Sequence, residues 1–344
     1  MQIQHNAQLS HFHTFGIAQT CAVLAKAQTI DDLIALYRDE QWQAMEKLML
    51  GKGSNMLFTQ PYQGLVVVNQ LMGREHRQDS EYHYLHVSGG EDWPELVEWA
   101  TKAGFSGLEN LALIPGCTGS APIQNIGAYG VEFKDICEYV DYLCLESFEV
   151  KRLTQVECQF GYRDSIFKHQ LKDRAIITAV GIKLAKQWQP NLNYGPLQQL
   201  DEQTVTAQQI FDIVVDVRQQ KLPDPEVTGN AGSFFKNPVI SQQQYQQLNQ
   251  LFPNLVAYPA GEQMKLAAGW LIDQCGLKGY TLGGAMVHPN QALVLVNAKQ
   301  ATAQDVVALA AYVRDRVLEK FNVELEHEVR FMGALNEVYL RDLV

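Results

Sequence analysis

The spacing of apolar residues along the chain predicts several helices. Residues 303–321 repeat apolar side chains at intervals of three and four, which predicts one long amphipathic helix. The run 242–250 is rich in glutamine, but Tyr245, Leu248 and Leu251 follow nearly helical spacing. A surface helix is therefore the interpretation of this run, rather than a low-complexity tail.

Start and stop signals delimit two more helices. Thr29 is followed three residues later by Asp32, the arrangement in which each side chain bonds the other residue's backbone amide. Asp92 and Glu95 repeat that arrangement, with a proline in the first turn and Gly104 at the far end. These signals predict helices beginning directly after Thr29 and Asp92.

Strands are predicted between the helices. Residues 65–68 are a short apolar run, and residues 140–180 are strand-like with an interruption at 161–167. Residues 323–331 alternate, so that the glutamates and Arg330 share one face while the apolar residues and His327 share the other, which predicts a final strand. The prolines of 222–225 predict a stiff linker into a new unit.

One segment, residues 114–130, has the period of neither a helix nor a strand and is rich in small residues. Gly116, Gly119, Gly127 and Gly130 allow positive φ angles, and successive bare amides in such turns can bind an anion. A second glycine-rich turn at 51–57 could hold the other side of the same ligand. Neither turn fits the P-loop or the Rossmann fingerprint, which argues against a P-loop NTPase and a classical NAD domain. The two turns together indicate a dinucleotide or pyrophosphate ligand, and the residues alone specify it no further.

Composition narrows the class of protein. A chain of 344 residues suggests two or three domains, and a net charge of −11 argues against a general nucleic-acid binder. No signal-like leader or membrane-length apolar run is evident, so we expect a cytoplasmic protein without a membrane partner. The six cysteines lack metal-ligand spacing, which predicts reduced thiols and no metal; Cys117, inside the glycine-rich segment, is interpreted as a tolerated small residue.

Eight segments, in order and spacing, resemble the UDP-N-acetylenolpyruvoylglucosamine reductases, flavoproteins of bacterial peptidoglycan synthesis. The segments are 14–16, 51–57, 110–130, 161–165, 221–225, 229–238, 265–274 and 328–331. The resemblance implies an α+β protein with an FAD-binding fold of the vanillyl-alcohol-oxidase type and a C-terminal α+β substrate domain. It also implies FAD-binding subdomains at 1–70, to which 327–344 would return, and at 71–220, with a substrate-binding domain at 221–326.

The resemblance implies that the two glycine-rich turns hold FAD without a covalent bond. The residues expected to bind it are Gly51, Lys52, Gly53, Ser54, Asn55, Met56, Leu57, Ile114, Pro115, Gly116, Cys117, Thr118, Gly119, Ser120, Ile123, Gln124 and Gly127.

The resemblance implies three catalytic residues, and the sequence around each of them also suits a purely structural role. Arg163 would bind the substrate carboxylate, although its pattern also suits an ion pair with Asp164. Ser233 would act as the general acid, although a serine after Ala-Gly is usually a turn residue. Glu328 would stabilise the enolic intermediate, although the alternation also suits a solvated strand face.

In the implied reaction, NADPH reduces the flavin, which then passes hydride to the vinyl carbon of UDP-N-acetylglucosamine enolpyruvate and yields UDP-N-acetylmuramate. The residues expected to bind the sugar nucleotide are Tyr129, Tyr194, Lys221, Asn237 and Gln291, with Tyr194 in a loop that one subgroup carries. We expect a monomer that acts on small molecules. A sugar-nucleotide binder without redox chemistry and an oxygen-using flavin oxidase are the alternatives.

Overall fold

The computed structural model describes all residues from 1 to 344 and divides them into two compact units. The first unit comprises residues 1–5, 23–52 and 65–219, and the second comprises residues 6–22, 53–64 and 220–344. The chain thus passes from one unit to the other several times, and the glycine-rich turn 51–57 contains one of these passages. The three-part division at residues 70 and 220 stays a prediction.

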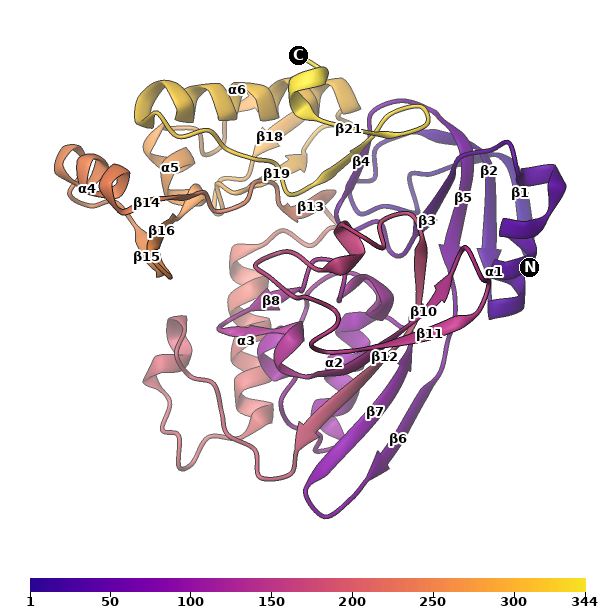
Figure 1. Ribbon diagram of the computed structural model, residues 1–344. Helices are drawn as coiled ribbons and strands as arrows, with labels where there is room; N and C mark the ends of the chain where they lie inside the picture. Colours follow the sequence, from indigo (N-terminus) through magenta and orange to yellow (C-terminus); the bar gives the residue numbers. More distant parts are fainter. The chain divides into compact units, whose positions relative to one another are not determined.

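The first unit contains a five-stranded antiparallel sheet in the order β11-β10-β12-β7-β6 (Figure 1). Its strands are β6 (Arg74–Gln78), β7 (Tyr82–Ser88), β10 (Cys137–Cys144), β11 (Val150–Thr154) and β12 (Ala175–Ala185). Helices α2 (Trp93–Lys102) and α3 (Ala207–Lys221) contribute Trp93 and Ile210 to the core that the apolar side chains of β7 and β12 also form. The short strands β8 (Gly127–Ala128) and β9 (Val131–Glu132) pair as a hairpin.

A second sheet has the order β1-β2-β5-β3, with β3 and β5 parallel. Its strands are β1 (Gln2–Gln8), β2 (Thr20–Ala27), β3 (Lys47–Leu50) and β5 (Tyr62–Asn69), and α1 (Ile30–Arg38) follows β2. Short 3₁₀ turns occur at Glu40–Trp42, Glu109–Leu111, Thr118–Ser120, Phe133–Asp135, Ile166–Lys168, Gly195–Gln199 and Leu340–Asp342.

The second unit is built around α6 (Ala303–Phe321), which contacts a sheet of order β13-β19-β18-β17 (Figure 1). These strands are β13 (Asn230–Ser233), β17 (Thr281–Leu282), β18 (Ala285–Val287) and β19 (Val294–Asn297). The sheet β14-β16-β15 comprises β14 (Val239–Ser241), β15 (Ala257–Ala260) and β16 (Gln263–Leu266), with α4 (Gln242–Leu251) and α5 (Ala268–Gln274) nearby in sequence. In the third sheet β20 (Arg330–Met332) lies parallel to β4 (Met56–Phe58) and antiparallel to β21 (Glu337–Val338).

The helices predicted from spacing and caps are confirmed. Thr29 and Asp32 form the reciprocal cap of α1, and the Asp92 carboxylate accepts a hydrogen bond from the Glu95 amide at the start of α2. Helix α6 spans the residues that the apolar spacing delimits, and the glutamine-rich run forms α4. Local signals were sufficient here because capping and amphipathic spacing both act within one or two turns.

The predicted final strand over 323–331 is mostly wrong. Only residues 330–332 form a strand, although Val323, Leu325 and Val329 are buried while Glu324 and Glu326 are exposed. The preceding residues make a single bridge between His327 and Phe235 instead of a regular ladder. Alternating burial is therefore present without the continuous pairing that defines a strand.

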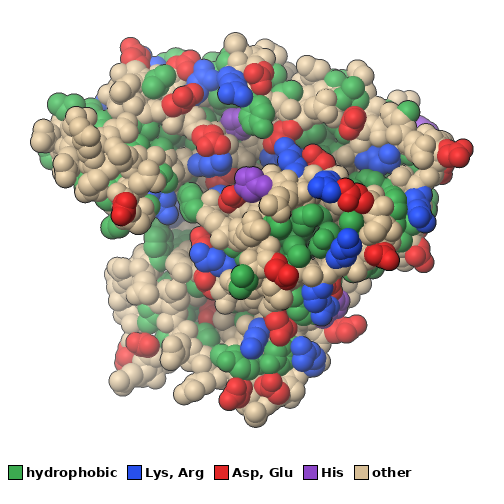
Figure 2. Space-filling view, in the orientation of Figure 1, with side chains coloured by type: hydrophobic (Ala, Val, Ile, Leu, Met, Phe, Trp, Pro, Cys, Tyr) green, Lys and Arg blue, Asp and Glu red, His purple; other side chains and the backbone are tan.

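Acidic and basic side chains are interspersed on the visible surface, and neither sign gathers into a large patch (Figure 2). None of the helices combines the length and the apolar character that crossing a bilayer requires.

Candidate active site

Within the first unit the two glycine-rich segments meet. A Cβ atom on Gly51 would lie 2.5 Å from the Cys117 Sγ, so only glycine allows this approach. Asp92 forms a backbone bridge with Cys117, and its carboxylate pairs with the Lys52 ammonium at 3.2 Å. The predicted neighbourhood of the two segments is therefore observed at Gly51 and Lys52.

The prediction of a row of bare amides in the longer segment is wrong at three residues. The Thr118 amide donates to the Glu91 carbonyl, the Gly119 amide to the Gly89 carbonyl, both at 2.8 Å, and the Ser120 amide to the Cys117 carbonyl at 2.9 Å. These three backbone amides are therefore already hydrogen-bonded within the protein and are not available to bind a ligand. Contacts of Thr118, Gly119 and Ser120 with a cofactor stay predictions, and they would have to involve other atoms.

Cys117 has the properties of a structural thiol. Its side chain is 3% exposed, and burial raises its pKa, so the thiolate is disfavoured at neutral pH. This environment agrees with its interpretation as a small residue tolerated inside the loop.

Two polar atoms without partners lie beside the other glycine turn, in the second unit. The Thr14 amide donates to the Gly53 carbonyl at 3.2 Å, while the Thr14 hydroxyl and the His13 Nδ1 are buried without a hydrogen bond. A Cβ on Gly53 would lie 2.6 Å from the His13 Cα. Unsatisfied buried polar groups cost roughly 1–3 kcal/mol each unless a ligand bonds them. The turn therefore fits a polar ligand such as FAD.

The other residues predicted to bind FAD lie on the same two segments. Met56 and Leu57 belong to β4 and are buried, Leu57 within the apolar core, so neither presents a polar side chain. Asn55 donates from its amide nitrogen to the Glu328 carbonyl at 3.2 Å. Gly127 opens β8, and its carbonyl accepts a hydrogen bond from Arg163. The remaining members of the set are Ser54, Ile114, Pro115, Gly116, Ile123 and Gln124.

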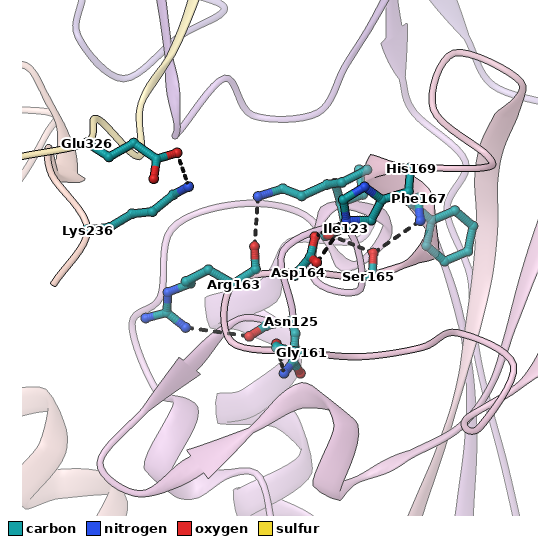
Figure 3. Close-up of polar contacts among 11 residues, drawn as sticks. Ile123, Asn125, Gly161, Arg163, Asp164, Ser165, Phe167, His169, Lys236 and Glu326 are labelled. Carbon is teal, nitrogen blue, oxygen red and sulfur yellow. Dashed lines mark hydrogen bonds and ion pairs between the residues drawn. The ribbon is translucent and has the colours of Figure 1, made fainter. Parts of the chain in front are cut away.

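Arg163 is half-buried, and its guanidinium donates to the backbone carbonyls of Asn125 and Gly127. Asp164 accepts from the His169 ring at 2.8 and 2.9 Å, and the Arg163 guanidinium donates to the Asn125 carbonyl at 3.5 Å (Figure 3). The same guanidinium donates to the Gly127 carbonyl at 3.1 Å. Lys168 donates to the Arg163 carbonyl at 2.8 Å, and Arg163 has a φ of 55°. A non-glycine residue held at positive φ is uncommon and marks a backbone that its neighbours constrain.

Ser233 and Glu328 lie on adjacent segments of the second unit. The Glu328 amide donates to the Phe234 carbonyl at 2.8 Å, and the Lys236 amide donates to the Glu326 carbonyl at 2.9 Å. Lys236 and Glu326 also form an ion pair at 2.5 Å (Figure 3). Ser233 is exposed at the end of β13, and Glu328 is half-buried. These backbone bonds place the segment that follows Ser233 beside the segment that contains Glu328.

His327, one residue before Glu328, is satisfied within the protein. Its Nδ1 bonds the Val329 carbonyl at 2.7 Å, and its ring stacks on Phe331 with centroids 4.5 Å apart. Its other nitrogen lies 3.4 Å from the Leu340 amide. These contacts make His327 a structural histidine.

Two predicted substrate residues, Tyr129 and Tyr194, meet in the first unit. Their rings contact edge to face with centroids 5.9 Å apart. Asn110 links the two segments by donating to the Tyr129 carbonyl at 2.9 Å and to the Asn191 carbonyl at 3.0 Å. Tyr129 is held at a positive φ of 48°. Its ring packs against Tyr194, whose side chain is 48% exposed and therefore accessible to a ligand.

The start of the Tyr194 loop is anchored as well. Trp188 donates from its indole to the Glu109 carboxylate at 2.7 Å, and Asn191 donates to the Gly130 carbonyl at 3.0 Å. Burial raises the pKa of Glu109, while the hydrogen bonds from Gly107 and Trp188 oppose that rise.

The other predicted substrate residues lie in the second unit. Lys221 is exposed at the end of α3. Asn237 accepts a hydrogen bond from the Ala268 amide at 2.9 Å, which leaves its amide NH₂ available as a donor. Gln291 lies between the paired strands β18 and β19, and its side-chain oxygen accepts from the Leu293 amide at 3.4 Å.

Sequence reasoning missed Arg218 in the first unit, whose Nε is buried without a hydrogen-bond partner and whose charge opposes the rise that burial causes in the pKa of Tyr129. The signal was present in the sequence. Arg218 follows the buried residues Ile210 and Val214 at four-residue steps, so helical spacing places a charged residue on an apolar face.

Comparisons with known proteins cover both units. Residues 21–147 match the family model described as an FAD binding domain, and residues 224–332 match the C-terminal domain of UDP-N-acetylenolpyruvoylglucosamine reductase. The UDP-N-acetylenolpyruvoylglucosamine reductase of Vibrio cholerae is 61% identical over 341 residues, covering 99% of this chain and 98% of that protein. The protein of that name from Pasteurella multocida is 54% identical over 331 residues, covering 96% and 97%.

A solved structure extends the match. The UDP-N-acetylenolpyruvylglucosamine reductase of Thermus caldophilus superposes with a TM-score of 0.68 at 26% identity, covering 96% of this chain and 99% of that chain. The predicted α+β fold with an FAD-binding domain and the predicted cofactor FAD are thereby confirmed. With this fold, these two domains and relatives of such identity over its full length, the chain belongs to the UDP-N-acetylenolpyruvoylglucosamine reductase family.

Proposed function

We propose that this protein is an NADPH-dependent flavoenzyme that reduces UDP-N-acetylglucosamine enolpyruvate to UDP-N-acetylmuramate, a precursor of peptidoglycan. The observation that carries the proposal is the assembly of Ser233 and Glu328 on hydrogen-bonded neighbouring segments, in a chain whose relatives carry this reductase name over their full length. It acts as a monomer in the cytoplasm on small molecules.

When FAD is bound, it supplies the hydride acceptor and donor that no side chain can replace. The residues proposed to hold it are those of the two glycine-rich segments, together with Thr14 and His13, whose buried polar atoms lack protein partners. These last two extend the set expected from the sequence.

The side chains of the protein stabilise charge and move a proton. Hydride addition to the vinyl carbon of the substrate places negative charge on the adjacent carbon and on its carboxylate. Arg163 offers a planar guanidinium that can bind two carboxylate oxygens, and its positive φ fixes where that group projects. Glu328 stabilises the enolic form through a hydrogen bond.

Ser233 donates the proton that completes the reduction. A serine hydroxyl is a weak acid, but an enolate carbon is basic enough to take its proton. The exposure of Ser233 at the end of a strand, with Gly232 at a φ of 69°, leaves its hydroxyl accessible to a ligand. Tyr129, Tyr194, Lys221, Asn237 and Gln291 bind the sugar nucleotide.

The proposal is tested by anaerobic titration of the purified flavoprotein. NADPH should bleach the flavin absorbance near stoichiometrically, and later addition of UDP-N-acetylglucosamine enolpyruvate should restore it with formation of UDP-N-acetylmuramate. UDP-N-acetylglucosamine, which lacks the enolpyruvyl group, is the control that should restore nothing. Bleaching without reoxidation by the enolpyruvyl compound would refute the proposed substrate, and rapid reoxidation by oxygen alone would favour an oxidase.

A further inference from the structure

Arg218 is a half-buried cation with a buried Nε, and the proposed reaction assigns it no role. It lies in α3, four residues after the buried Val214, so helical spacing turns it toward the core of the first unit. Its Nε is buried without a hydrogen-bond partner, and no carboxylate forms an ion pair with it. Because a buried charge is retained only where something compensates it, this guanidinium requires an explanation.

The neighbour of Arg218 points to a ligand. Burial raises the pKa of the Tyr129 hydroxyl, and the nearby Arg218 guanidinium opposes that rise. A phenol is neutral at physiological pH and cannot neutralise the arginine. The C-terminal end of α3 supplies only the partial negative charge of a helix terminus. The compensating anion is therefore absent from the protein itself.

The surroundings of Tyr129 are those of a prepared binding site. Tyr129 is held at positive φ, its carbonyl is fixed by Asn110, and its ring supports the exposed Tyr194. Two residues earlier, the Gly127 carbonyl accepts from Arg163. One short segment thus connects Arg218 with two residues to which the proposed function already gives ligand contacts.

We propose that Arg218 binds an oxyanion of the sugar nucleotide, a phosphate or a carboxylate, beside Tyr129. A planar guanidinium with a desolvated Nε is suited to two parallel hydrogen bonds with such a group, and desolvation strengthens both. This inference deepens the proposed function and rests on its ligand being an anionic sugar nucleotide. Arg218 then contributes to affinity and selectivity for charged ligands.

The test measures binding by calorimetry to the oxidised, flavin-loaded enzyme, in which no turnover occurs. Arg218→Met should weaken the binding of UDP-N-acetylglucosamine enolpyruvate roughly ten- to a hundredfold, the usual scale for losing a charge-assisted pair of hydrogen bonds. Arg218→Lys keeps the positive charge but cannot form two parallel hydrogen bonds, so it should lose less affinity than Arg218→Met. Arg174→Met removes an exposed arginine that pairs with Glu146 in the same unit and should change nothing.

A second ligand identifies the anion. UDP-N-acetylglucosamine keeps the diphosphate but lacks the enolpyruvyl carboxylate. An equal loss of affinity for both ligands assigns Arg218 to a phosphate, and a loss confined to the enolpyruvyl compound assigns it to the carboxylate. Either loss supports the inference. Because these are binding measurements, they stay decisive even if the redox titration above fails.

Stability separates this role from a structural one. Without ligand, Arg218→Met should keep its flavin and show an equal or higher Tm, since it removes an uncompensated buried charge. Unchanged affinities with a lowered Tm would overturn the inference. If Arg218→Met fails to load flavin, the binding measurements are made on Arg218→Lys instead. Wild-type affinity of Arg218→Lys for both ligands would then refute the inference.

Discussion

At the scale of single residues, the structure separates groups that the protein satisfies internally from groups it leaves for a ligand. His327 bonds a carbonyl and stacks on Phe331, and Asp164 pairs with His169. In contrast, Arg218 and Thr14 have buried polar atoms without partners. The second class could not be found from residue types alone, because the presence of a partner depends on tertiary contacts.

Ser233 provides the first test of a chemical role at this scale. Ser233→Ala should leave flavin reduction by NADPH near the wild-type rate, since the hydroxyl acts only after that step. Reoxidation by the enolpyruvyl substrate should slow roughly a hundredfold to ten-thousandfold, the range for losing a general acid. Stopped-flow absorbance of the flavin resolves the two half-reactions.

Controls fix the interpretation of that experiment. Ser233→Cys should keep part of the activity, because a thiol can donate a proton from a shifted position. Ser80→Ala, at an exposed serine of the β6–β7 turn, should leave both half-reactions unchanged. If Ser233→Ala reoxidised at the wild-type rate, Ser233 would be a turn residue without a role in proton transfer.

His13 carries a prediction about pH and stability. The side chain is 4% exposed, and burial lowers its pKa from 6.5 to about 4. The unfolded chain therefore binds a proton at a higher pH than the folded one, so the stabilisation is complete above pH 6.5 and is lost as the pH falls toward 4. The difference corresponds to about 3 kcal/mol of unfolding free energy.

Urea unfolding of the flavin-loaded protein at several pH values measures this effect. His13→Gln should show a flatter dependence between pH 6.5 and 4 than the wild type, whatever its absolute stability. Parallel curves for the two proteins would mean that another group causes the loss.

At the scale of elements, prediction from the sequence succeeded where local signals decide. The caps of α1 and α2 and the spacing of α6 act within a few residues, and these helices formed as predicted. The final strand failed because a strand needs a partner: Leu325 and Glu326 alternate in burial, yet no neighbouring strand pairs with them continuously. The glycine-rich loop shows the same limitation, since the acceptors of the Thr118 and Gly119 amides are the carbonyls of Glu91 and Gly89.

The Tyr194 loop is the element whose role is most directly testable. Its start is anchored by Trp188 and Asn191, while Tyr194 itself is half-exposed against Tyr129. Tyr194→Ala should therefore raise the Kd of the sugar nucleotide roughly tenfold and leave flavin reduction by NADPH unchanged. Titration calorimetry and stopped-flow absorbance provide the two measurements.

The matched control lies in the same loop. Gln199→Ala, at an exposed residue of the following 3₁₀ turn, should alter neither quantity. Equal damage to both half-reactions by Tyr194→Ala would indicate a folding defect rather than a lost ligand contact.

At the scale of the whole molecule, fold and family were accessible from the order and spacing of short motifs spread over most of the chain. Each motif alone is weak evidence, but the relatives match from end to end. The two compact units were not accessible in this way. The chain passes between them near residues 5, 22, 52, 64 and 219, and those passages depend on which strands pair, as β4 does with β20.

The cofactor supplies the last prediction, which concerns how FAD is retained by the whole protein. The purified protein should be yellow, and acid precipitation should release all of the flavin into the supernatant. The reason is chemical: the Cys117 thiol is buried with a raised pKa, so it is a poor nucleophile for a covalent bond to the flavin. Removal of FAD should also lower the Tm, since a ligand that binds only the folded state stabilises it by mass action. Colour retained in the precipitate would contradict the prediction, and Cys117→Ala and His13→Gln would then identify the attachment atom, because only loss of the linking side chain frees the flavin.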